Sequence, residues 1–268
     1  MYPRILGVYS YRKSEEIGTG STQKSHQSVT YWFVRRLDDD RYELQPLNTN
    51  HVPSGIVTIV GSGEFAKCYF PETDYYNRYT VPAMKTLKAK IERGEENYKN
   101  GDLEQAEKEF LKAVMVDDGN ASANLGLGSV YCDKGEYNKV KKVLAVILNN
   151  DAVFREEQRH SFNTFGIGLR KGGLYNEAIT YYRTALKGNP ADENLLFNMA
   201  RAYLDAGDLE NAVESAQNAL DINPDFVEAQ KLLLFLKKKM AGEDADAKFI
   251  DGPDIPLGEA TPSLDPAD

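Results

Sequence analysis

Two stretches of the chain, KGGLYNEAITYYRTALKGNP (171–190) and DAGDLENAVESAQNALDINP (205–224), carry the same pattern 34 residues apart. The residues that recur are small or turn-forming, and they are Gly173, Ala178, Ala185 and Pro190, followed by Gly207, Ala212, Ala219 and Pro224. Apolar residues at helical spacing lie between each glycine and the next proline, which indicates an amphipathic helix in each stretch. A fixed period of this length is typical of helical units stacked in series.

The pattern resembles the tetratricopeptide repeat, a helix–turn–helix unit of about this length. Framed on the small-residue positions, four units span 87–120, 121–154, 159–192 and 193–226, and we expect a capping helix over 227–240. Four residues near 155–158 are inserted, and we expect them to lengthen the first helix of the third unit. The resemblance implies a mainly α fold, a solenoid of helix pairs over residues 81–240.

The small residues have a physical reason. Two antiparallel helices cross closely only where one contact position is glycine or alanine, so we expect the recurring alanines to face inward. A glycine recurs at the turn of each unit, where the left-handed conformation that ends a helix favours it. These turn glycines are Gly101, Gly135, Gly173 and Gly207.

Residues 1–80 do not continue the repeat. Segments 4–11, 29–36, 41–46 and 56–60 are rich in β-branched and aromatic residues, as strands are, and a short helix is expected over 63–69. Residues 14–27, rich in Ser, Thr, Gly, Lys and Gln, are predicted to be a mobile loop. We expect a small aromatic-rich β element that packs on the first repeat as an N-terminal cap.

The net charge of −9 is unevenly placed, because eight acidic residues and one lysine follow Met240. Segment 241–268 is therefore predicted to be a disordered acidic tail. The acidic balance argues against a nucleic-acid or membrane-surface partner. No leader or membrane-spanning run is recognised, and the two cysteines are expected to be reduced, so we predict a cytoplasmic protein.

No constellation of nucleophile, base or metal ligands stands out, so we predict a non-enzymatic protein without a metal or cofactor. The family resemblance implies that the first helix of each repeat lines a concave groove that binds a peptide or protein segment. We expect an acidic ligand, because arginine binds carboxylates and asparagine binds backbone amides. The groove residues on this reading are Tyr98, Ser129, His160, Asn163, Arg170, Asn194, Phe197, Asn198 and Arg201.

Several alternatives stay open. The resemblance also offers a test for chaperone-binding repeats, whose dicarboxylate clamp needs lysine and arginine at set positions. In one alignment of the repeats, the clamp positions hold Leu125, Ser129, Thr164, Asn194 and Asn198. Neither this alignment nor the alternative one places lysine or arginine at a clamp position, which argues against binding of a chaperone tail. Alternatively, the chain is a regulatory module in which the β element binds a small ligand or nucleotide and the repeats respond to that binding. The apolar run Leu232–Leu236 offers a surface for self-association. The acidic tail could bind in the groove as a weak competitor of the ligand.

Overall fold

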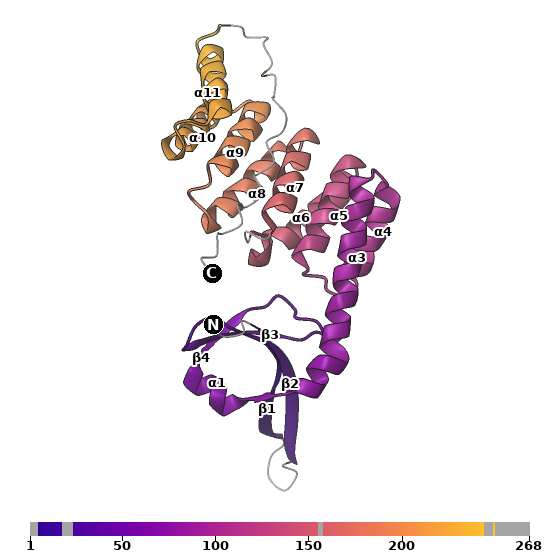
Figure 1. The fold of residues 1–268 in the computed structure, drawn as a ribbon. Coiled ribbons are helices and arrows are strands. Elements are labelled where there is room, and N and C mark those ends of the chain that lie inside the picture. Colours follow the sequence, from indigo (N-terminus) through magenta and orange to yellow (C-terminus); the bar gives the residue numbers. More distant parts are fainter. Residues whose placement is uncertain (1–4, 18–23, 155–157, 244–248, 250–268) are drawn as a thin grey trace, which may run out of the picture. The chain divides into compact units, whose positions relative to one another are not determined.

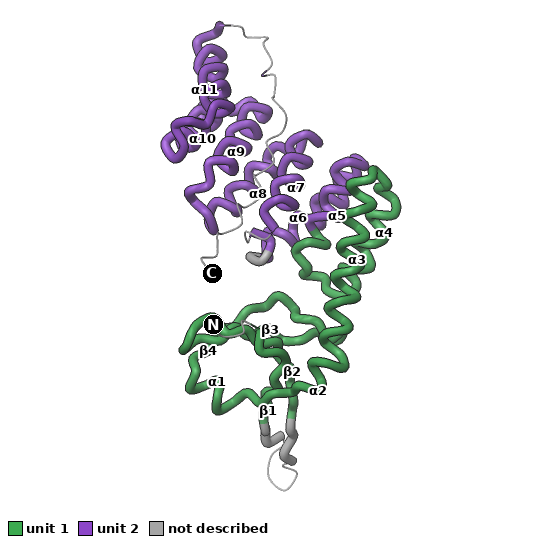
Figure 2. The backbone as a smooth tube through the Cα atoms, viewed as in Figure 1, with its two compact units in different colours: residues 1–124 green, residues 125–268 purple. Residues whose placement is uncertain are grey.

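The computed structural model describes residues 5–17, 24–154, 158–243 and Phe249. The chain forms two compact units, residues 1–124 and residues 125–268 (Figure 2). The boundary between them lies inside helix α5 (Ala121–Asp133), so the first helix pair belongs to the same unit as the β element. The division therefore differs from a boundary near residue 80. The first repeat is continuous with the segment that precedes it.

A five-stranded antiparallel sheet forms the first part of unit 1, in the order β4-β3-β2-β1-β5 (Figure 1). The strands are β1 (Ile5–Ile17), β2 (Lys24–Arg36), β3 (Arg41–Pro46), β4 (Thr58–Gly61) and β5 (Tyr69–Pro71). Helix α1 (Ser62–Cys68) connects β4 to β5, the two opposite edge strands. In a flat sheet these edges would lie about 19 Å apart, whereas seven helical residues rise only about 10 Å. The sheet therefore curls, and Phe65 of α1 packs in the core with Val34, Leu44 and Val60.

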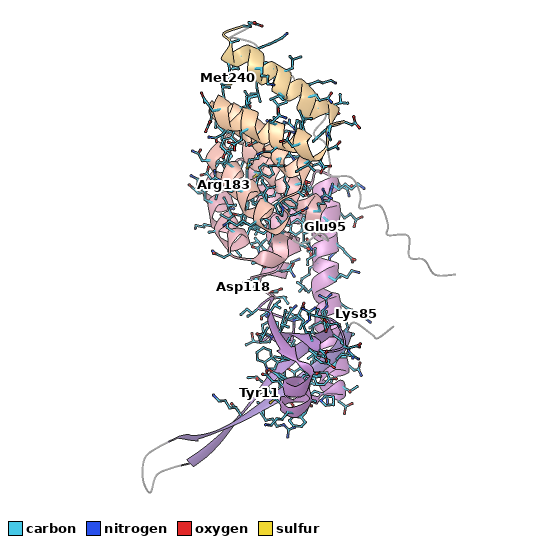
Figure 3. The ribbon with its side chains drawn as sticks, turned by 90° about the vertical axis from the view of Figure 1, so that its left-hand side faces the viewer. Tyr11, Lys85, Glu95, Asp118, Arg183 and Met240 are labelled. Carbon is cyan, nitrogen blue, oxygen red and sulfur yellow. The ribbon has the colours of Figure 1, made fainter. Side chains whose placement is uncertain are left out.

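The β1–β2 hairpin is longer than the sequence indicates. Ser14 pairs with Gln27 and Ile17 pairs with Lys24, so the predicted loop over 14–27 is wrong except for 18–23, which lie outside the described residues. Figure 3 shows the hairpin extending past the other strands beyond Tyr11. Strand pairing there is made by the backbone ladder, which needs no apolar alternation, and this explains why a polar composition misled the sequence reading.

The loop after β3 joins the sheet to the first helix pair within unit 1. Val52 is buried with Leu87 and Ala113, and the Asn48 and Asn50 side-chain amides each donate to the Val116 carbonyl oxygen at 2.8 and 2.9 Å. Helices α2 (Thr73–Tyr75) and η2 (Tyr76–Thr80) lead directly into α3 (Val81–Lys99), which packs on α4 (Leu103–Val114). These contacts tie the β element to the first repeat.

Unit 2 is helical and its helices lie side by side in series (Figure 1). After α5 come α6 (Tyr137–Leu148), the short η3 (Asp151–Phe154), α7 (Arg159–Lys171), α8 (Tyr175–Gly188), α9 (Glu193–Ala206), α10 (Leu209–Ile222) and α11 (Val227–Met240). Helix α7 has 13 residues, as many as α5, so the expectation that the insertion lengthens this helix is wrong. The extra residues lie in the connection before it, where 155–157 are outside the described part of the chain.

The repeat signature has the structural role that its residue types predict. All four turn glycines have positive φ, from +69° to +83°. Ala178, Ala185, Ala212 and Ala219 are buried. Glycines also mark the closest helix contacts, since a Cβ on Gly166 would lie 2.7 Å from the Tyr182 ring of the adjacent helix. The α-solenoid fold class is therefore confirmed, with the small N-terminal sheet.

Candidate functional site

The first helices of successive repeats, α5, α7 and α9, contact one another in unit 2. Gly128 and Cys132 of α5 lie against Phe165 and Gly168 of α7, close enough that a Cβ on either glycine would meet the opposite side chain at 2.6 to 3.1 Å. Helix α7 in turn contacts α9. Residues on one face of these helices are therefore brought together although they lie one repeat apart in the sequence.

The centre of the α7–α9 contact is a pair of asparagines. The Asn198 amide nitrogen donates to Asn163 Oδ1 at 2.8 Å, and the two residues are only 3% and 2% exposed. Each amide has a donor and an acceptor group, and buried groups of this kind are normally hydrogen-bonded. The sequence predicted both as ligand-binding residues, and the structure places them in direct contact.

An arginine–aspartate pair lies on either side of this centre. Arg170 Nη1 donates to Asp205 Oδ2 at 2.6 Å, and Arg159 Nη2 donates to Asp192 Oδ2 at 2.9 Å. Asp192 is buried and also accepts from the backbone N–H groups of Asn194 and Leu195, so it is the N-cap of α9. We call the cross-helix set Arg159, Asn163, Arg170, Asp192, Asn198 and Asp205 the polar seam.

The other predicted groove residues surround the polar seam to different extents. Arg201 is buried with its guanidinium carbon 5.5 Å from the centre of the Phe197 ring, an arrangement that favours a cation–π attraction. His160 of α7 is exposed and Asn194 of α9 is half-buried. Ser129 is buried on α5. Tyr98 lies on α3, which belongs to unit 1.

Sequence reasoning missed the acidic members of the polar seam. It selected arginines and asparagines for a ligand and left Asp192, Asp205 and Arg159 unassigned. A signal existed for Asp192, because aspartate directly before a helix is a frequent N-cap. No local signal pairs Arg170 with Asp205, since only the packing of α7 on α9 brings them into contact.

Helix α11 buries most of the apolar run that suggested self-association. Leu232, Leu233 and Leu236 pack inward, whereas Leu234 is 59% exposed. The ring of Phe235 lies 5.4 Å from that of Phe249. Phe249 begins the segment predicted to visit the groove, and it lies instead on α11. The remainder of that segment is outside the described residues, so its competitor role stays a prediction.

The aromatic residues of the β element contact one another. Tyr42 stacks on Phe65 with ring centroids 4.1 Å apart, as Tyr31 does on Tyr75. Next to the second pair, His51 Nδ1 lies 2.7 Å from the Tyr75 hydroxyl oxygen, and among the described residues His51 is the one non-glycine with positive φ (63°). Burial raises the pKa of the Tyr75 hydroxyl. Tyr31, His51 and Tyr75 are all half-buried.

The described residues hold no group of three or more histidine, cysteine or acidic residues placed to bind a metal ion. Cys132 is buried, and burial raises the pKa of its thiol to about 12, so it is unsuited to nucleophilic chemistry. None of the helices in the described segments is long and apolar enough to cross a bilayer.

Comparison with known proteins is consistent with the repeat geometry. Residues 169–234 match the family model described as tetratricopeptide repeat. The chain is 33% identical over 88 residues to Hsp70-Hsp90 organizing protein 3 of Arabidopsis thaliana, which covers 33% of this chain and 15% of that protein. It is 37% identical over 73 residues to the Photosystem I assembly protein Ycf3 of Prochlorococcus marinus (strain MIT 9211), which covers 26% of this chain and 42% of that protein. The matched region thus spans less than half of either relative.

A solved structure described as "Crystal structure of MamA protein" is also similar. The match has a TM-score of 0.47 and 19% sequence identity, and it covers 60% of this chain and 86% of that one. A structural similarity with this TM-score and sequence identity supports no inference about function.

Proposed function

We propose, from the premise that this chain is a tetratricopeptide repeat protein, that it is a non-enzymatic adaptor. It binds a segment of another polypeptide along the face formed by α5, α7 and α9. The named relatives support the general role, because one is an organizing protein for Hsp70 and Hsp90 and another an assembly protein. The class of partner that this chain binds is inferred below from the chemistry of the face formed by α5, α7 and α9.

The observation that carries the proposal is the polar seam. Three hydrogen bonds cross from α7 to α9, and each joins residues 33 or 35 positions apart, which is one repeat. Four residues of the polar seam, Asn163, Arg170, Asp192 and Asn198, are buried. Burying charged and amide groups is costly unless they are hydrogen-bonded, so their placement on one face favours a recognition role beyond packing. A helix pair that only needed stability could use apolar residues at these positions.

The ligand expected here is an extended segment with acidic residues. Arg159, Arg170 and Arg201 supply the cations that would bind its carboxylates, although Asp192 and Asp205 already pair with the first two. The exposed His160 and the half-buried Asn194 are the groups that a ligand meets first. The buried Asn163–Asn198 pair would then exchange its mutual hydrogen bond for bonds to the ligand backbone.

The resemblance to a chaperone-organizing protein does not extend to the clamp residues. Leu125, Asn194 and Asn198 stand at the clamp positions that need lysine or arginine, and none of them carries a positive charge. A ligand that ends in two carboxylates would therefore lack the paired cations that it needs. We propose an internal acidic segment instead of a chaperone tail.

The proposal is tested with the double variant Asn198→Ala/Arg201→Ala. Its matched control is Lys187→Ala/Asn218→Ala, which changes exposed residues of α8 and α10. Fluorescence anisotropy measures binding of labelled acidic peptides, including one with the sequence of residues 249–257 of this chain. We expect at least tenfold weaker binding by Asn198→Ala/Arg201→Ala and none of that loss in the control. Equal affinity of both variants for every bound peptide would refute the proposal.

The same experiment is repeated with the chain shortened after Met240. If segment 241–268 is a weak competitor, peptide affinity should rise when it is removed. Unchanged affinity would eliminate the competitor role and leave the adaptor proposal intact.

A second candidate function is ligand binding by the Tyr31–His51–Tyr75 cluster of unit 1. The positive φ of His51 favours it, because strained backbone concentrates at functional sites. A thermal-shift screen against nucleotides tests it, since a ligand that binds only the native state raises the melting temperature. A melting temperature unchanged by every nucleotide would remove this candidate.

A further inference from the structure

Strand β4 is an edge strand of the sheet in unit 1. It is hydrogen-bonded to β3, with Arg41 opposite Gly61 and Leu44 opposite Thr58, and no strand lies on its other side in the described sheet order. An edge of this kind presents backbone donors and acceptors that can pair with another chain.

The sequence at this edge lacks the usual protection. Segment 52–63, VPSGIVTIVGSG, contains no charged residue, although lysine and other charges are what natural edge strands use to prevent pairing. Its apolar side chains are also accessible: Ile56 is 65% exposed, Val57 39% and Ile59 56%. Ile59 lies in β4, and Ile56 and Val57 directly precede its first residue, Thr58, so pairing centred on Thr58 takes both into the strand. The three β-branched apolar residues then form an uncharged surface suited to strand addition.

The segment is also close to symmetric about its centre. With Thr58 as the midpoint of Ile-Val-Thr-Ile-Val (56–60), an antiparallel copy places Val57 opposite Ile59 and Ile56 opposite Val60. Val60 points into the core of the sheet and Ile59 points away from it, so each face of the joined strands receives apolar pairs. An interface in which residue i meets j while j meets i is what a two-fold dimer requires.

We propose that a second copy of this chain pairs with β4, antiparallel and centred on Thr58, to form a continuous ten-stranded sheet across a dimer. The occupant is the chain itself because the pattern complements itself. A charged peptide would find no opposite charge in segment 52–63. This surface is separate from the polar seam, and neither proposal depends on the other.

The first experiment is the mass of the full-length chain by light scattering and sedimentation over micromolar concentrations. We expect a species of twice 30.0 kDa that dissociates on dilution, because two edge strands bury a small interface. Ile59→Lys should reduce the dimer at least tenfold at equal concentration. Since this side chain is already exposed, the variant should keep the circular dichroism and melting temperature of the parent chain.

The matched control is Leu234→Lys, which changes a residue of equal exposure on α11. It should leave the dimer intact. A chain that is monomeric at all concentrations overturns the proposal, and so does a dimer that survives Ile59→Lys. A dimer lost in Leu234→Lys but not in Ile59→Lys would place self-association on α11 instead.

A crosslink tests the register. Residues directly opposite in an antiparallel pair have Cα atoms about 4.5–5.5 Å apart, within the range of a disulfide. Thr58→Cys in a Cys68→Ala background should therefore form an interchain disulfide under mild oxidation. Glu64→Cys in the same background, exposed on α1, should not. Equal crosslinking by both variants would refute pairing centred on Thr58.

Discussion

Replacing Gly166 by alanine tests the packing on which the candidate site depends. A Cβ on Gly166 would lie 2.7 Å from Cε1, Cζ and Oη of Tyr182, which is fully buried. Overpacking of this kind costs about 1–3 kcal/mol, whereas the better helix propensity of alanine returns about 1 kcal/mol. All three contacted atoms belong to one rigid aromatic group with no space to move into. We therefore expect a cost near the upper end of that range and a net loss of about 2 kcal/mol.

The assay is thermal unfolding followed by circular dichroism. A loss of this size should lower the melting temperature by about 4–8 °C. The matched control is Gly188→Ala in α8, where an added Cβ meets no atom within 4 Å, and its melting temperature should stay the same or rise slightly. A double-mutant cycle with Tyr182→Leu should show that the two changes compensate, because the smaller side chain leaves room for the methyl group. If Gly166→Ala is as stable as the parent chain, the close α7–α8 crossing is wrong.

Three further predictions concern single side chains. Cys68, half-buried, should react with Ellman's reagent in the native protein, whereas buried Cys132, with its pKa raised to about 12, should react only after unfolding, and equal native rates would contradict this. Asp192→Ala should destabilise the chain by about 1–3 kcal/mol in urea unfolding, because a buried cap and ion pair are lost together, and an unchanged midpoint would contradict the cap. The hydrogen bond from Lys141 lowers the pKa of Glu177, so its stabilising effect is present above the ordinary carboxyl value of 4.5 and is lost as the pH falls through the lowered pKa. The difference in melting temperature between the parent chain and Glu177→Gln should therefore shrink from pH 7 towards about pH 3, and a difference that grows in acid would reverse the sign of this argument.

The repeat region shows which structural features a local sequence pattern can predict. Alanines 178, 185, 212 and 219 and the four turn glycines could be assigned from spacing alone, because they recur at fixed positions of a 34-residue unit. The capping helix follows for the same reason. By contrast, the polar segments 14–17 and 24–27 were predicted to be a loop, since the hydrogen bonds that each receives from the other are recognised only when the two strands are paired.

The candidate site divides in the same way. Position within the repeat was enough to select Asn163, Arg170 and Asn198 as residues of one face. That Asn198 donates to Asn163, and that Arg170 binds Asp205, depends on how α7 packs on α9. A residue's own helix determines where its side chain can point, but a contact across 35 residues depends on the distance between two helices, which no local pattern contains.

By itself, therefore, the sequence determined the helical period, the turns, the inward-facing small residues and the uncharged, apolar composition of segment 52–63. These features arise from local sterics and from the burial of apolar groups at a fixed spacing. The tertiary structure alone decided the hydrogen bonds across the polar seam, the curl of the sheet and the position of β4 at its edge. Each of these depends on which surfaces meet after the elements have formed.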